Sequence, residues 1–166
     1  SEDFRSLANS LGKEKEFDEY IKYIFSNNNV SLNGGFLCYE EENKKIAELI
    51  PKDKIVIDVG CSFGIQQVLF KNHRMYVGIQ KFREGNNCWE NFKPKFRSLL
   101  KNVLILEGEF KDFAPMIEPL IRGNEDDFYG IANHSLWHDP KRNEDDIKWF
   151  KKLFPNNYYA TDEGNK

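Results

Sequence analysis

The sequence contains few cysteines, and they form no motif. Only three of its 166 residues are cysteine, at positions 38, 61 and 88, and no pair is spaced as C-x-x-C. This argues against the disulfide framework of small secreted domains and against a cysteine-rich zinc site. We therefore expect a protein of the reducing cytoplasm, stabilised by a hydrophobic core.

Long apolar runs and an excess of positive charge are also absent. No apolar stretch reaches the ~18 residues that span a membrane, and Ser1–Phe4 lack the basic and apolar regions of a signal peptide. The formal net charge is −3, so no overall positive field would attract nucleic acid. A small basic cluster leaves nucleic-acid modification as a minority alternative. It consists of Lys71, Arg74, Lys81 and Arg83.

The composition is that of one globular unit. Apolar residues make up 40% of the chain and charged residues 31%, and the 14 phenylalanines are expected mostly in the core. Residues 1–50 are predicted to be helical, with an apolar helix between Phe17 and Phe25 and a second helix from Tyr39 to Leu49 that Pro51 stops. We expect residues 1–50 to form a cap or lid, and residues 51–166 to form a ligand-binding domain.

From Lys54 onward the pattern alternates between strands and helices. The predicted strands are Ile55–Val59, Met75–Ile79, Val103–Glu107, Phe128–Asn133 and Tyr158–Thr161. The predicted helices are Ile65–Lys71, Trp89–Leu100, Phe113–Arg122 and Glu144–Leu153. Apolar strands separated by helices indicate an α/β fold, with a doubly wound, mostly parallel sheet and helices on both faces. Ligands of such sheets bind beyond the carboxyl ends of the strands.

The loop after the first predicted strand is rich in small residues. Asp58 stands near the strand end, and Gly60 and Gly64 are spaced G-x-x-x-G around Ser62. This spacing differs from the G-x-G-x-x-G of dinucleotide sites, and Asp58 would repel a pyrophosphate. An acid here favours a ligand with a positive amino group, such as the methionine part of S-adenosylmethionine. The alternative is an ordinary turn from strand to helix.

The segment Asp58-Val-Gly-Cys-Ser-Phe-Gly64 resembles the D/E-x-G-x-G-x-G motif of the class I S-adenosylmethionine-dependent methyltransferases, with Ser62 at the middle glycine. The resemblance extends from about Tyr39 to Thr161. It implies a Rossmann-like fold and S-adenosylmethionine as the cofactor. By this resemblance the cofactor-binding loop includes Asp58, Gly60, Cys61, Ser62 and Gly64.

The ends of the next two strands extend the resemblance. Gln80 stands where the family carries an acid that holds the ribose hydroxyls, and an amide can still accept and donate to a diol. Glu109 matches the acid that accepts from the adenine amino group, and Phe110 would then flank the base. The alternatives are a surface glutamine at position 80 and a core phenylalanine at position 110.

The fourth strand leads into a segment with two histidines. By the resemblance, Asn133 would bind the cofactor, while His134 and Ser135 would face the reaction site. His134 or His138 could take a proton from the acceptor, because histidine titrates near neutral pH. We do not expect a metal or a hydrolase triad here, since the sequence has neither H-E-x-x-H nor G-x-S-x-G. Trp137 is expected to pack in the core.

Only five strands are predicted, so we expect the sheet to lack the C-terminal hairpin of the family. The open edge beside Tyr158–Thr161 could then pair with a second copy or a protein partner. The acidic runs Glu40–Glu42, Glu125–Asp127 and Glu144–Asp146 are interpreted as solvent-exposed surfaces. The favoured function is methyl transfer from S-adenosylmethionine to a small molecule or another polar acceptor. The alternative is a non-catalytic module that binds S-adenosylmethionine or a protein.

Overall fold

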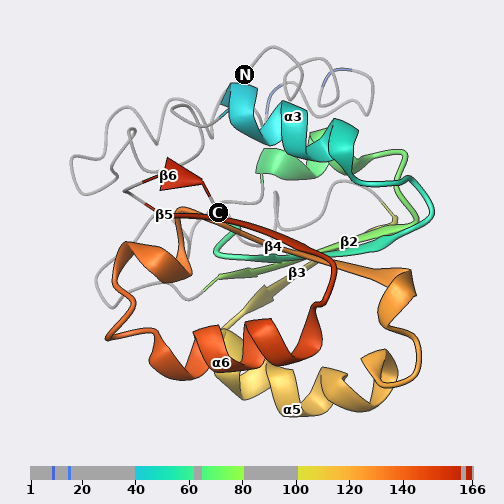
Figure 1. Ribbon diagram of the computed structural model, residues 1–166. Coiled ribbons are helices and arrows are strands. Elements are labelled where there is room, and N and C mark those ends of the chain that lie inside the picture. Colours follow the sequence, from blue (N-terminus) through green and yellow to red (C-terminus); the bar gives the residue numbers. More distant parts are fainter. Residues whose placement is uncertain are drawn as a thin grey trace.

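The computed structural model describes residues 40–61, 65–80, 101–161 and 164–165, together with the single residues 9 and 15. A central sheet lies between two helical layers (Figure 1). One layer contains helix α3 (Glu40–Leu49) and the 3-10 helix η1 (Ile65–Phe70). The opposite layer contains α5 (Phe110–Ile121) and α6 (Glu144–Leu153). The doubly wound arrangement expected from the alternating pattern is confirmed.

The sheet has the strand order β3-β2-β1-β4-β5-β6. Five of these strands run parallel, namely β1 (Ile55–Val59), β2 (Met75–Gln80), β3 (Val103–Glu107), β4 (Phe128–Asn133) and β5 (Asn157–Thr161). Strand β1 pairs with β2 on one side and β4 on the other, so the chain direction across the sheet reverses at β1. Such a switch point is where doubly wound sheets bind ligands.

The predicted elements that fall in the described ranges are present, with shifts at their ends. The sequence did not predict β6 (Gly164–Asn165), a two-residue strand that pairs antiparallel with the end of β5. Helix α5 begins at Phe110, three residues before the predicted start, and the segment after β1 is a 3-10 helix. Two further 3-10 turns are η2 (Glu125–Asp127) and η3 (Leu136–His138). The helices predicted around residues 17–25 and 89–100 lie outside the described residues.

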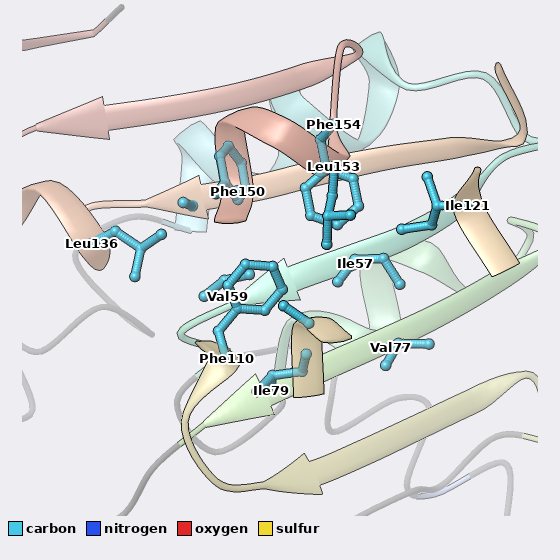
Figure 2. Packing of buried hydrophobic residues seen from close by; sticks show 12 residues of the cluster. Ile57, Val59, Val77, Ile79, Phe110, Ile121, Leu136, Phe150, Leu153 and Phe154 are labelled. Atoms are coloured by element: carbon cyan, nitrogen blue, oxygen red, sulfur yellow. The ribbon is translucent and has the colours of Figure 1, made fainter. Parts of the chain in front are cut away.

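The hydrophobic core between the sheet and helices α5 and α6 uses many of the aromatic residues (Figure 2). Phe110 from α5 stacks on Phe154 at a centroid distance of 6.1 Å, and Phe150 meets Phe154 edge-on at 5.2 Å. Gly130 on β4 makes room for these rings, since a Cβ there would lie 2.5 Å from the Phe154 ring. Burial of large apolar surfaces is the main source of stability in such a layer.

The opposite face of the sheet packs against α3 and η1. The buried residues Ile46, Ala47 and Ile50 mark the inner side of α3. Phe70 at the end of η1 stacks on Tyr76 of β2, with the ring centroids 4.9 Å apart. The layer formed by α3 and η1 therefore covers the face of the sheet that carries Asp58 of β1 and Tyr76 of β2. None of the helices in the described ranges is long and apolar enough to cross a membrane.

Candidate functional site

The turn after β1 is tied to the end of β2. Gly60 has φ +88°, a left-handed conformation that favours glycine. The backbone N–H groups of Gly60 and Cys61 both donate to the Ile79 carbonyl, at 2.8 and 3.2 Å. The chain therefore turns sharply at the switch point. Ser62 and Gly64, the other predicted residues of this loop, lie outside the described residues.

Gly60 is also required by the packing of the β4 end. A Cβ at position 60 would lie 2.3 Å from the Cβ of Ser135. The Ser135 hydroxyl donates to the Val59 carbonyl at 2.6 Å, which holds the segment after β4 against the end of β1. The fold thus demands glycine at this position whether or not a ligand lies against the loop. The same contact gives Ser135 a structural role, while its predicted catalytic role stays a prediction.

Asp58 is buried beneath the site. Only 6% of the residue is exposed, and its carboxylate accepts a hydrogen bond from the Tyr76 hydroxyl. Burial raises the pKa of this carboxyl to about 6, although the bond from Tyr76 lowers it. Our expectation of a carboxylate available to a ligand is wrong, because residue 58 alternates onto the face that packs against α3 and η1. Burial and the nearby Asp58 raise the pKa of the Cys61 thiol.

Gln80 and Glu109 bring hydrogen-bonding side chains to neighbouring strand ends. The Gly108 N–H donates to the Gln80 carbonyl at 3.0 Å, so the turn after β3 lies beside the end of β2. Glu109 directly precedes α5, and its carboxylate lies 3.5 Å from the Lys111 Nζ. Both residues are half-buried. The structure therefore brings together the two positions that the sequence assigned to a ribose and an adenine.

Phe110 does not present its ring to this site. The residue is 3% exposed, and its side chain packs among the aromatic rings of the α5–α6 layer (Figure 2). The prediction that Phe110 flanks a base is wrong, because α5 begins at this residue and turns its side chain inward. Its backbone N–H remains at the start of the helix, beside Glu109.

The end of β4 is joined to helix α3 through Glu42. The His134 Nε2 lies 3.2 Å from one carboxylate oxygen of Glu42, and the Tyr158 hydroxyl donates to the other at 2.7 Å. His134 has φ +56°, which is unusual for a residue other than glycine and is often found at functional sites. The interpretation of Glu40–Glu42 as a solvated run is wrong for Glu42, which is half-buried. No local signal in the sequence distinguishes Glu42 from the exposed Glu41.

A second contact joins the same elements. The Asn133 Nδ2 donates to the Asn43 Oδ1 at 2.9 Å, and Asn43 is only 8% exposed. The Asn133 Oδ1 is buried and accepts no hydrogen bond from any part of the chain that the structure describes. An unpaired buried acceptor costs roughly 1–3 kcal/mol. Asn133 therefore combines a fixed amide with an unused acceptor at the switch point.

The remaining predicted residues follow β4. His138 ends η3, and the structure does not describe its side chain. Trp137 packs as predicted, with its ring stacked on Tyr159 at 4.1 Å. Of the predicted basic cluster, Arg74 pairs with Asp127 at 3.7 Å, while Lys81 and Arg83 lie outside the described residues. Within residues 40–61, 65–80 and 101–161, no three His, Cys, Asp or Glu side chains are grouped to hold a metal ion.

Comparisons with known proteins support the fold. No family model matches the sequence, and no curated protein matches it. A solved structure from Porphyromonas gingivalis W83, of a protein assigned as a methyltransferase, is similar with a TM-score of 0.50 and 14% identity. A protein from Streptococcus mutans assigned as an S-adenosylmethionine-dependent methyltransferase is similar with a TM-score of 0.50 and 8% identity.

These two similarities cover most of this chain but a minor part of the other proteins. They span 72% and 76% of this chain, against 30% and 35% of the solved chains. The chain thus spans about a third of the length of these two solved chains. At such low identity the similarity concerns the fold. The described chain has the Rossmann-like α/β fold of the class I methyltransferases.

Proposed function

We propose that this chain is an S-adenosylmethionine-dependent methyltransferase that acts on a small molecule or another polar acceptor. The observation that carries the proposal is that polar residues stand at three strand ends, on the carboxyl side of a methyltransferase-like sheet. Gln80, Glu109 and Asn133 come from three separate strand ends and lie on one edge of the sheet. Doubly wound sheets bind their ligands at this edge.

The described side chains fit much of this cofactor. Gln80 can accept and donate hydrogen bonds, as a ribose diol requires, and Glu109 offers an acceptor for an adenine amino group. The unused Oδ1 of Asn133 suits the donor of an amino group. Asp58 does not fit the contact first expected of it, because its carboxylate is buried and bonded to Tyr76. Ser62 and Gly64 stay predicted members of the loop.

When bound, S-adenosylmethionine supplies a methyl group on a positively charged sulfur that is open to attack by a nucleophile. The work of the protein is then to hold the acceptor in line and to exclude water. We assign proton acceptance to His134, whose ring is oriented by Glu42. Ser135 would shape the site through its bond to Val59, and His138 remains the second candidate for the proton.

A specific observation also favours a second function, that of a non-catalytic binding module. Glu42 holds the His134 ring, and the Ser135 hydroxyl is bonded to the Val59 carbonyl. Two of the three predicted catalytic side chains therefore already have structural contacts. Such a module would bind S-adenosylmethionine, or a protein at the sheet edge, without transferring a methyl group. At the lateral edge of the sheet, where a partner was expected beside β5, strand β6 pairs with residues 160 and 161.

Calorimetry and a transfer assay separate the two functions. The enzyme is expected to bind S-adenosylhomocysteine saturably and to pass a labelled methyl group to at least one class of amine, hydroxyl or thiol acceptor. Glu109→Ala should weaken binding by about tenfold, the value of one hydrogen bond to a charged group. Asp112→Ala, three residues farther along α5 and exposed, should leave binding unchanged.

The outcomes divide clearly. Binding without transfer to any acceptor class would favour the module, and the absence of binding at millimolar ligand would contradict both cofactor-dependent functions. Equal losses in Glu109→Ala and Asp112→Ala would show that the ligand does not lie at the end of β3.

A further inference from the structure

The amide of Asn133 lies at the switch point on the face covered by α3. Strands β1 and β4 are in register with Asp58 beside Ile131, so Asn133 lies two residues farther on, level with the turn at Gly60. Side chains alternate along a strand, and Ile131 and Asn133 therefore share a face with Asp58. Figure 1 shows α3 above this face of the sheet.

Helix α3 fixes the orientation of this amide. Glu42 anchors the helix to His134, the residue after β4, and to Tyr158, near the start of β5. The next residue, Asn43, is buried and accepts a hydrogen bond from the Asn133 Nδ2 at 2.9 Å. Because the Nδ2 points toward α3, the Oδ1 of the same amide must point away from it.

The Oδ1 is therefore the group that Asn133 offers to a ligand. It is buried, and among the described residues it has no donor. Buried polar atoms in folded proteins nearly always have a partner, so an exception at a strand end calls for one that the described part of the chain does not supply. An amide oxygen can only accept, so the partner must donate. Carboxylate and phosphate groups are thereby excluded.

The surrounding charge favours a cationic donor. The Glu42 carboxylate is bonded to His134, the next residue, and to Tyr158, which pairs with Ile131 on the neighbouring strand. Asp58 pairs with Ile131 from the other side, on β1. We propose that the Asn133 Oδ1 accepts a hydrogen bond from a protonated amino group of the bound ligand, and that Asn43 is the positioning residue that orients it. This inference rests on the proposed function. The amino group belongs either to the amino-acid part of the cofactor or to an amine acceptor.

The first experiment compares S-adenosylhomocysteine with its analogue that lacks the α-amino group. If the amino group of the cofactor is the donor, the wild type should bind the full ligand about ten to a hundred times more tightly. Asn133→Leu should bind both ligands alike, at the affinity of the analogue. Circular dichroism checks that this variant folds. A preference of the same size in the wild type and Asn133→Leu would overturn this source of the donor.

The second experiment tests the role of Asn43 with a conservative rescue. An aspartate at position 43 can only accept, so Asn43→Asp should keep the Asn133 amide in place and preserve the preference for the amino group. Asn43→Leu frees the amide to rotate and should reduce the preference severalfold. Lys45→Gln, an exposed position on the same helix, changes the net charge as Asn43→Asp does and is the matched control. Loss of the preference in folded Asn43→Asp would mean that the amide is reversed, which overturns the inference.

A further arm distinguishes the sources of the amine. If the wild type binds both cofactor forms alike, butylamine is titrated into the complex with S-adenosylhomocysteine. Butylamine binding that is lost in Asn133→Leu and kept in Lys45→Gln supports an amine acceptor. If butylamine does not bind to the wild type, the inference is overturned. If S-adenosylhomocysteine does not bind at all, the proposed function fails. Butylamine alone then decides the inference by the same two variants.

Discussion

Gly60 has two separate reasons to be glycine, and a matched pair of variants separates them. Gly60→Ala should lower the free energy of unfolding by about 2–4 kcal/mol, because left-handed backbone and overpacking against Ser135 each add a cost. Gly123 has a similar φ of +83°, but a Cβ added there would meet no described atom within 4 Å, so Gly123→Ala should cost only about 1 kcal/mol. Urea unfolding measures both. Equal losses would contradict the contact with Ser135.

Asp58 makes the stability of the fold depend on pH. Its pKa rises from 3.8 to about 6 on folding, so the folded chain binds the proton more tightly. Its contribution is therefore fully present below pH 3.8 and is lost as the pH rises through about 6, by at most about 3 kcal/mol. Asp58→Asn removes this contribution.

The test of this pH effect is a comparison of unfolding curves. The free energy of unfolding of the wild type, minus that of Asp58→Asn, should fall between pH 4 and pH 7 and then become constant. Other titrating groups cancel in this difference. Two parallel curves would mean that the carboxyl is not perturbed by burial.

Gln80 departs from the acid that its apparent family carries, and the structure adds a reason. Gln80 pairs in register with Glu107, so an acid at position 80 would lie beside another carboxylate. Gln80→Glu should still tighten binding of S-adenosylmethionine, by up to about tenfold, if the ribose lies there. Gln80→Glu with Glu107→Gln should tighten it at least as much. Calorimetry with a 2'-deoxy analogue is the control. An equal gain in affinity for that analogue would show that the ribose does not lie beside Gln80.

At the scale of elements, α3 depends on Glu42 for its attachment. Glu42→Ala breaks the contacts with His134 and Tyr158 and should cost about 2 kcal/mol of unfolding free energy. Glu42→Gln retains one acceptor and should cost less. Hydrogen exchange of α3 should speed up in Glu42→Ala. Glu41→Ala should change neither measurement, because the ion pair of Glu41 with Lys44, at 3.4 Å, is exposed. Equal effects at both positions would contradict the attachment.

At the scale of the whole molecule, a bound cofactor should raise the melting temperature. A ligand at a hundred times its dissociation constant adds about 2.7 kcal/mol, which corresponds to roughly 5–10 °C for a chain of this size. Thermal scans with S-adenosylhomocysteine should show this shift, and Glu109→Ala should reduce it at the same ligand concentration. If Glu109→Ala keeps the full shift in melting temperature, the ligand does not contact Glu109.

The sequence by itself determined the architecture and the strand ends at which we propose the site. The strands are apolar runs bounded by turn residues, and such local patterns predicted β1, β3 and β4 with their observed bounds. The glycines and polar residues at the ends of the strands indicated the positions of Gly60, Gln80, Glu109 and Asn133. These signals are readable because each lies within a few residues of its own strand.

The tertiary structure alone decided which of these side chains are buried by other elements. The burial of Asp58 and of the Phe110 ring depends on helices that pack from elsewhere in the chain. The partnership of Glu42 with His134 and Tyr158 joins residues separated by 92 and 116 positions. Strand alternation and motif spacing cannot predict contacts over such separations in sequence. The surroundings of a side chain at a strand end depend on which distant element packs over it.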